Sequence, residues 1–347
     1  MIVNLFLSSH VWTAPLNAFG VRQHVAALYE EVFRGSEVRV YPRNREGGLL
    51  VNGLRHLPAL LSGGINVLTQ GYPIVTGALA TWITRNPRLI VHTWKVPGFS
   101  DERMSAKVND LLLRRVINRA RAVVVVSKLQ RRQLEALGVS CPVVFAPVSV
   151  DSAFWRADPE DLDAVLMHFG LAKHGYILTA GGPDRDEVYA ARVARILEVP
   201  YVRASWDIHT AERSRLQLAR EGLENYSRIL NNPSDVELRA LYAGAHVVCL
   251  PTLTRTNPAG LTSLVTAMAC GAAVAIPETI AEGYIEDGTN GLVFRGSPDE
   301  FAARTLSLHD KLPLIRQKAR QFAENELNTI TVAKHLKTKL QTQRVLD

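Results

Sequence analysis

The sequence predicts an α/β protein made of two doubly wound domains that face each other across a cleft. Short apolar runs alternate along the whole chain with longer stretches whose apolar residues recur at helical spacing. The chain has 347 residues, more than one domain of average size. Nearly half of the residues are hydrophobic, enough for two cores. These observations predict two parallel sheets with helices on both faces, that is, two Rossmann-like domains.

The first half of the chain supplies the strands of one predicted sheet. Apolar runs predict strands at residues 2–7, 37–41, 65–69, 89–94 and 123–126. Helical spacing predicts a helix that opens near Phe19 or Gly20, one that runs through Ile83, and one from Glu102 to Arg121. A polar helical stretch at residues 158–173 leads into the second domain.

Two strand ends in the second half carry residues typical of an anion site. The strand at 176–180 is followed by Gly181, Gly182 and Arg185. The strand at 246–250 is followed by a polar loop and a helix that starts near Ala259-Gly260. Ligands of open α/β sheets bind where the carboxyl ends of such strands meet. Because a guanidinium and the free amides of a helix N-terminus both favour phosphate, we expect a phosphate-containing ligand there.

Several phrases of this half, in the right order, resemble the donor-binding segment of retaining GT-B glycosyltransferases, the family that includes glycogen- and sucrose-synthase-like enzymes. They are Asp235 to Ala245, Leu250-Pro251, Asn257 to Thr262, Ala267 to Gly271 and Asp287 to Leu292. The resemblance implies the GT-B fold and transfer of a hexose or pentose from a nucleotide-sugar to an acceptor hydroxyl, with retention. The alternative is a generic Rossmann-like half without sugar chemistry.

The resemblance also implies a domain division and a set of site residues. Residues 1–165 would bind the acceptor, residues 166–325 the nucleotide-sugar, and residues 326–347 would form a helix that returns to the first domain. Arg185 and His92 are the implied catalytic residues. Acceptor candidates are His10, Asn17, Gly20 and His92, and both histidines have an equally simple structural reading. Donor candidates are Gly181, Gly182, Arg185, Leu230, Asn231, Asn232, Thr256, Asn257, Ala259, Gly260, Leu261, Thr262, Ser263 and Thr266.

The chain departs from the family pattern at two positions. Many members carry two glutamates eight residues apart, one facing the donor sugar and one the ribose, and these positions are Pro258 and Thr266 here. A hydroxyl accepts hydrogen bonds less strongly than a carboxylate. The departure leaves open an unusual donor, an altered pose, or a binding partner that has lost turnover. Glu278, Glu282 and Glu286 are candidates to replace the missing carboxylates.

Charge is concentrated in the first half. Residues 1–150 hold 18 Lys and Arg against 8 Asp and Glu, a net charge of +10, and the remainder holds 22 against 25, a net of −3, which together give +7. This balance predicts an acidic acceptor or one presented at an anionic surface, through contact with lipid head groups or nucleic-acid phosphates. Glycosylation of modified DNA bases is therefore an alternative function. A well-solvated basic surface would explain the same charge.

Neither a metal nor another cofactor is expected beside the nucleotide-sugar. Cys141, Cys249 and Cys270 lie far apart without metal-ligand spacing, as buried thiols of a reducing compartment would. Asp184 and Asp186 imitate the Asp-x-Asp of metal-dependent glycosyltransferases, but they precede a helix, where Asp186 is expected to serve as a cap. The N-terminal strand-like run lacks a basic leader. We therefore expect a cytoplasmic protein, with the inner membrane face as a place of contact.

Overall fold

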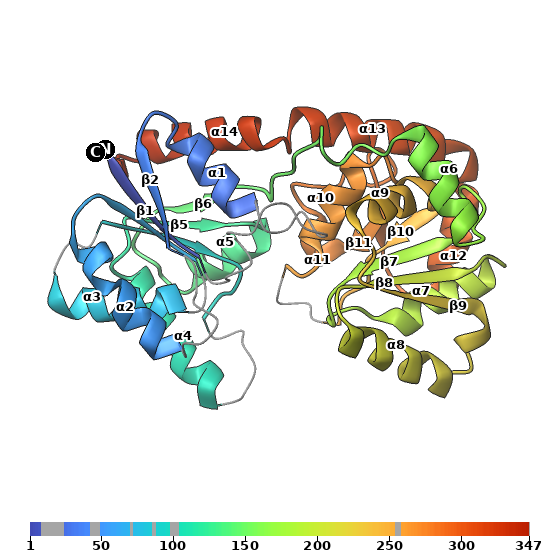
Figure 1. Ribbon diagram of the computed structural model, residues 1–347, viewed down its shortest axis with the longest axis horizontal. Helices are drawn as coiled ribbons and strands as arrows, with labels where there is room; N and C mark the ends of the chain where they lie inside the picture. Colours follow the sequence, from blue (N-terminus) through green and yellow to red (C-terminus); the bar gives the residue numbers. More distant parts are fainter. Residues whose placement is uncertain are drawn as a thin grey trace.

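The computed structural model describes residues 1–7, 24–41, 49–69, 72–84, 88–97, 104–253 and 258–346. Over this part the chain forms two parallel six-stranded sheets, each with helices on both faces (Figure 1). The architecture confirms the predicted α/β fold of two Rossmann-like domains. No helix among the described residues combines the length and the apolar character that a membrane crossing requires.

The N-terminal sheet has the order β2-β1-β3-β4-β5-β6. All its pairs are parallel, and the four central strands are buried almost completely, as expected of a sheet covered on both sides. Its strands are β1 (Ile2–Phe6), β2 (Glu37–Tyr41), β3 (Ile65–Leu68), β4 (Leu89–Thr93), β5 (Ala122–Val125) and β6 (Val143–Phe145).

Helices of this domain form two layers on opposite faces of the sheet (Figure 1). One layer contains α1 (His24–Val32) and α14 (Thr329–Thr342), which share a hydrophobic cluster with the strands. The other contains α2 (Leu49–Leu61), α3 (Tyr72–Ile83), α4 (Met104–Ile117) and α5 (Lys128–Ala136). The sequence pattern did not predict α2, and we return to the reason below. The helix predicted to open near Phe19 or Gly20 is described only from His24 onward.

The C-terminal sheet has the order β12-β11-β10-β7-β8-β9. The chain order reverses between β7 and β10, so a ligand crevice is expected at the carboxyl ends of these two strands. The strands are β7 (Ile177–Gly181), β8 (Tyr201–Ser205), β9 (Ser227–Asn231), β10 (Val247–Cys249), β11 (Val274–Pro277) and β12 (Leu292–Phe294).

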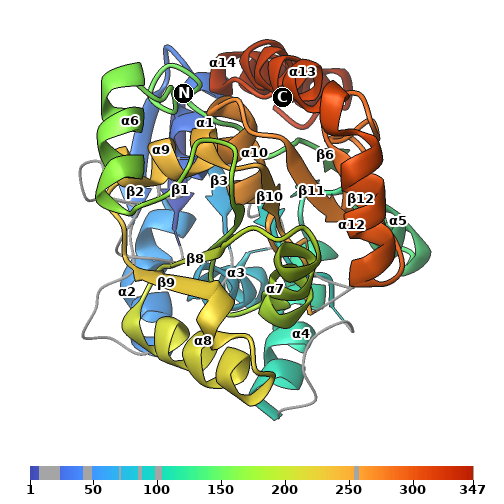
Figure 2. The ribbon, with the colours of Figure 1, turned by 90° about the vertical axis from the view of Figure 1, so that its right-hand side faces the viewer.

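The helices of the C-terminal domain also cover both faces. One cluster joins the sheet to α6 (Pro159–His168), α9 (Asp235–Gly244), α10 (Leu261–Ala269), α11 (Glu278–Ala281) and α13 (Leu312–Asn325). The other joins it to α7 (Glu187–Ile196), α8 (Ile208–Arg220) and α12 (Pro298–Ser307). α6 packs beside α9, as the view onto this domain shows (Figure 2). The division expected between residues 165 and 166 therefore falls inside a helix that lies wholly with the second domain.

Four connections between the two domains are seen in the described parts of the chain. The segment around Val148 crosses between them, and α13 continues into α14, which packs on α1 beside the N-terminus (Figure 1). The third is Tyr284, whose hydroxyl donates to the carbonyl of Val126 at 2.6 Å and accepts from the amide of Val148 at 2.8 Å. Glu282 adds exposed ion pairs to two basic residues of α5.

Candidate functional site

Arg185 lies at the predicted strand end, buried and without a carboxylate partner. It is 4% exposed, and its Nε donates to the carbonyl of Ala180 at 3.2 Å. A backbone bridge to Thr252 fixes it between β7 and the segment after β10. Within the described residues it makes no ion pair, and its two Nη groups have no hydrogen-bond partner. Burial, followed by the positive charge of Arg203, lowers the pKa of Arg185 to about 10, so the guanidinium remains charged at neutral pH.

The N-terminus of α10 opens beside this guanidinium. Its N-cap is Gly260, with φ of +100°, and no side chain in the described part of the chain caps the first turn. By contrast, Asp186 caps α7, as the sequence predicted, and Ser234 caps α9. A Cβ placed on Gly260 would lie 3.7 Å from Cζ of Arg185. The amides of the α10 first turn and the Arg185 guanidinium therefore converge on the same place.

Gly181 is glycine because of this convergence. Its φ is +123°, a region that side chains rarely adopt. An added Cβ would stand 2.7 Å from Nη2 of Arg185 and 3.2 Å from the hydroxyl of Ser263. Any side chain here would displace the guanidinium. The glycine thus preserves both the backbone turn and the position of the cation.

A second arginine, which the sequence did not single out, holds the Gly181-Gly182 turn. Arg203 on β8 is fully buried, and its Nε donates to Oε1 of Glu187 at 2.8 Å. Its Nη2 donates to the carbonyls of Gly181 and Gly182 at 3.0 and 2.8 Å. The hydroxyl of Ser214 donates to the same Glu187 oxygen at 2.6 Å. A charged residue in the middle of an otherwise apolar strand was the available signal, since such a charge needs a partner when buried.

The same sheet edge continues to the end of β9. Asn231 and Asn232 are exposed, and Leu230 is half-buried. Asn232 has φ of +51°, and its amide donates to the carbonyl of Ser205 at 2.8 Å. Trp206 follows β8 and lies 3.8 Å from where a Cβ of Gly182 would be. The structure therefore brings the β9 residues, Gly182 and an indole ring to one side of Arg185.

The predicted residues of α10 divide into two groups. Ser263 and Thr266 are buried, and their hydroxyls donate to the carbonyls of Ala180 at 3.3 Å and Thr262 at 2.8 Å. Thr266 is therefore occupied inside its own helix and does not point a free hydroxyl at a ligand. Ala259, Gly260 and Thr262 are partly exposed, and Leu261 is buried. Thr256 and Asn257 lie outside the described residues, and Pro258 is buried.

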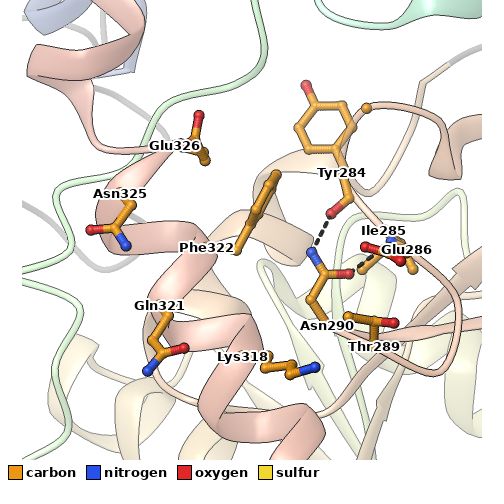
Figure 3. Close-up of a pocket in the computed structure, with 11 residues that line it drawn as sticks. Tyr284, Ile285, Glu286, Thr289, Asn290, Lys318, Gln321, Phe322, Asn325 and Glu326 are labelled. Atoms are coloured by element: carbon orange, nitrogen blue, oxygen red, sulfur yellow. Dashed lines mark hydrogen bonds between the residues drawn. The ribbon is translucent and has the colours of Figure 1, made fainter.

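The glutamates considered as substitutes are engaged elsewhere or lie apart. Glu278 pairs with Arg295 at 2.6 Å, and Glu282 pairs with Arg132 at 2.5 Å. Glu286 lines a cavity of about 610 Å³ between α13 and the loop after α11, together with Lys318 and Phe322 (Figure 3). This cavity shares no lining residue with the Arg185 site. A second cavity, of about 400 Å³, lies next to the Arg185 site at the carboxyl ends of β10, β11 and β12. Asp186 and Arg295 contribute to its lining.

His92 ends up in a closed environment. Its ring is 2% exposed, Nδ1 lies 3.2 Å from the Tyr29 hydroxyl, and Nε2 is buried without a partner. Burial lowers the pKa of His92 to about 4, so the imidazole is neutral at physiological pH. The cavity that it lines with Trp94 measures about 10 Å³, too small for a sugar. The remaining acceptor candidates, His10, Asn17 and Gly20, lie outside the described residues.

Among the described residues, no three His, Cys, Asp or Glu side chains gather in a way that could hold a metal ion. Asp186 accepts from the amide of Tyr189 at 3.0 Å, in the capping role expected of it. Arg192, the nearest basic residue one to two turns into α7, is exposed and pairs with Glu221 at 2.5 Å. It therefore does not add its charge to the Arg185 site.

Comparisons with known proteins agree with this geometry. Residues 185–311 match the family model described as Glycosyl transferases group 1. Sucrose-phosphate synthase from Thermosynechococcus elongatus is similar with a TM-score of 0.78 at 14% identity, over 100% of both chains. HepE from Anabaena, solved in complex with UDP and glucose, gives 0.76 at 17% identity, over 98% of this chain and 99% of HepE.

A third structure, trehalose-6-phosphate synthase OtsA, gives a TM-score of 0.70 at 11% identity, over 98% of this chain and 99% of OtsA. A search of curated protein sequences found no match. At these identities the structural likeness establishes the shared two-domain fold. The family match covers residues 185–311, which belong to the C-terminal domain. The chain therefore has the two-domain GT-B fold of these structures, and its C-terminal domain contains a segment that matches the Glycosyl transferases group 1 model.

Proposed function

We propose that this enzyme moves a sugar from a nucleotide-sugar to an acceptor hydroxyl, with retention and without a metal ion. One observation carries the proposal: the buried guanidinium of Arg185, which has no ion-pair partner among the described residues, faces the N-terminus of α10, which no described side chain caps. A buried cation without a partner is costly, and a bound diphosphate would remove that cost. Both groups favour phosphate for independent physical reasons, charge pairing and the helix dipole.

The reaction needs positive charge where the leaving phosphate develops negative charge. As the bond between the anomeric carbon and the phosphate oxygen breaks, Arg185 and the amides of Leu261 to Ser263 stabilise the departing diphosphate. The acceptor oxygen forms the new bond to the anomeric carbon, and its proton passes to the leaving phosphate. Since the cation is fixed by the backbone on both sides, little reorganisation is required during the step.

We further propose that the nucleotide base lies toward the end of β9. Exposed backbone at Asn231-Asn232 and the indole of Trp206 lie on the side of Arg185 where a nucleoside attached to the diphosphate would extend. The base could stack on the Trp206 ring and form hydrogen bonds with backbone groups of the Asn231-Asn232 turn. HepE was solved with UDP and with UDP-glucose, so uridine nucleotides are the first donors to try.

Thermal unfolding in the presence of nucleotides tests the proposal, because a ligand of the native state raises the melting temperature. We expect UDP, UDP-glucose or another nucleotide-sugar to raise it, and Arg185→Ala to abolish the shift. Arg192→Ala is the matched control, because this arginine lies on the adjoining helix, is exposed and faces Glu221. Cys141→Ser, in the N-terminal domain, should also keep the shift. An unchanged shift in Arg185→Ala would remove this residue from the site.

The replaced glutamates favour one second candidate, a protein that binds a nucleotide-sugar without turning it over. Pro258 cannot accept a hydrogen bond with its side chain, and the Thr266 hydroxyl is bonded to Thr262. The two candidates differ in slow donor hydrolysis, which a competent site shows even without acceptor. Release of free UDP that is lost in Arg185→Ala supports transfer, whereas a thermal shift without UDP release supports the binding role.

A further inference from the structure

Helix α2 packs on the domain core through Leu60 and Leu57, yet it also exposes several large apolar residues and buries a polar one. Leu50, Val51 and Leu54 are 64%, 61% and 57% exposed, and Leu61 continues the same face near the helix end. On the opposite side, Asn52 is 1% exposed. A surface helix of a soluble domain normally has the reverse pattern. This orientation therefore requires an explanation outside the domain's own core.

The two neighbouring helices extend the apolar surface. Trp82 and Ile83 at the end of α3 are 63% and 62% exposed, and Val108 and Leu111 on α4 are 50% and 68% exposed. α3 packs against both α2 and α4, and the three form one layer on the face of the sheet opposite α1 and α14 (Figure 1). Eight of the twenty large hydrophobic side chains that are exposed among the described residues lie on these three helices. Their concentration marks an interaction surface.

The same layer is strongly basic. The three helices and the turn after α4 contain one acidic residue, Asp110, against five basic ones, which are Arg55, Lys107, Arg114, Arg115 and Arg119. Arg115 lies over the Trp82 ring at 5.0 Å and donates to the Thr81 hydroxyl at 3.0 Å, which holds the indole between α3 and α4. The other four arginines and lysines make no ion pair with any described residue.

We propose that this apolar–basic face, formed by the exposed residues of α2, α3 and α4, docks on the surface of an anionic lipid bilayer. Leu, Ile and Trp side chains insert at the boundary between head groups and acyl chains, and the basic residues meet the lipid phosphates. Trp is especially suited to this boundary because its ring is apolar and its N–H is polar. The inference does not depend on the donor site, which lies in the other domain.

The chemistry of the face disfavours the other occupants. A second copy of the chain would place the same basic residues opposite one another, and such like-charge contacts are unfavourable. Nucleic acid would satisfy the charge, but it would leave the Leu, Val and Ile side chains without an apolar partner. A bilayer rich in acidic lipids satisfies both requirements at once.

Flotation with lipid vesicles tests the proposal. We expect the full-length protein to float with vesicles of one part phosphatidylglycerol to two parts phosphatidylcholine, and to bind pure phosphatidylcholine much less. Adding salt should weaken the binding, because exposed charges are screened. The double variant Leu54→Glu/Leu111→Glu should lose at least about tenfold in partitioning. Arg114→Ala should lose about fivefold on the acidic vesicles, the contribution of one basic residue near such a surface.

Matched controls lie on the other domain. Leu216→Glu/Leu314→Glu replaces two leucines that are 62% and 52% exposed on α8 and α13, and it should bind vesicles as the wild type does. Because all four positions are exposed, each variant should keep the wild-type melting temperature and the nucleotide-induced shift, which separates lost docking from unfolding and from failure of the proposed function.

Four results would overturn the proposal. The first is no flotation with acidic vesicles at low salt. The second is equal loss in the α2/α4 variant and the control variant. The third is a wild-type dimer in light scattering that the Leu54→Glu/Leu111→Glu variant dissociates, which would assign the face to self-association. Tight, salt-sensitive binding to duplex DNA without vesicle binding would likewise assign the charge to nucleic acid.

Discussion

Replacing Arg203 by methionine should destabilise the C-terminal domain more than any exposed arginine replacement. The methionine keeps the apolar stem but removes the guanidinium. Glu187 then retains only the hydroxyl of Ser214 as a partner in its buried position, 3% exposed. The carbonyls of Gly181 and Gly182, which accept from Arg203 at 3.0 and 2.8 Å, lose their donor.

The expected magnitude follows from the burial of the pair. Breaking a buried ion pair by removing one partner costs about 3–5 kcal/mol, because the remaining charge is uncompensated. For a domain of this size, each kcal/mol lowers the melting temperature by about 2–4 °C, so we expect a drop of about 6–20 °C. Arg192→Met is the matched control. Its ion pair to Glu221 is 48% and 39% exposed, and such pairs contribute less than about 1 kcal/mol.

Thermal unfolding of three variants separates the roles of the pair. Glu187→Gln/Arg203→Met removes both charges and should regain much of the stability lost in Arg203→Met. The nucleotide-induced rise in melting temperature should still be smaller in this double variant than in the wild type. The reason is that Arg203 no longer holds the Gly181-Gly182 turn beside Arg185. If Arg203→Met unfolds at the same temperature as Arg192→Met, the buried pair does not stabilise the fold in the way argued here.

Three further predictions concern other parts of the molecule. Gly181→Ala should lower the free energy of unfolding by about 1–3 kcal/mol and abolish the nucleotide-induced rise in melting temperature. Gly222 also has a positive φ, of +65°, but has open space around it. Gly222→Ala should therefore lower stability without changing the nucleotide-induced rise. Tyr284→Phe should lower the free energy of unfolding in urea by about 1–3 kcal/mol, because the carbonyl of Val126 and the amide of Val148 lose their partner. Tyr226→Phe is the control: its ring is half-exposed, and the change should leave the free energy of unfolding almost unaltered. The pKa of His92 is lowered to about 4 in the folded state, so the unfolded state takes up the proton first as pH falls from about 6.5. Stability should then fall by about 3 kcal/mol by pH 4, and His92→Gln should flatten this dependence in urea titrations at several pH values.

The sequence predicted the elements that have a strong period and missed those whose pattern is unusual. Strands β1 and β3 to β5 of the first sheet, β7 and β10 of the second, and the capping role of Asp186 could be predicted from short apolar runs and a cap residue. α2 was not predicted, although its apolar residues recur at helical spacing, because Gly53 and Pro58 inside the segment are typical of turns.

At the site, the sequence located Arg185 but could not tell it apart from Arg203. Arg185 follows the end of β7, Arg203 lies in the middle of the neighbouring β8, and both are buried. The difference arises from the position of one carboxylate: Glu187, in the first turn of α7, reaches Arg203 on β8 and leaves Arg185 unpaired. That assignment depends on how α7 packs over two strands, which residue spacing does not encode.

The different roles of Arg203 and Arg185 explain why a buried guanidinium can remain able to bind an anion. Arg203 is neutralised, so it can hold the glycine turn permanently without attracting a ligand. Arg185 keeps its charge because the turn held by Arg203 and the bridge to Thr252 fix its backbone, while no acidic group within the described residues approaches closely enough to pair with it. Without a ligand, the unpaired charge of Arg185 lowers the free energy of unfolding. A bound diphosphate pairs with this charge, so the removal of the penalty contributes to the binding free energy of the donor.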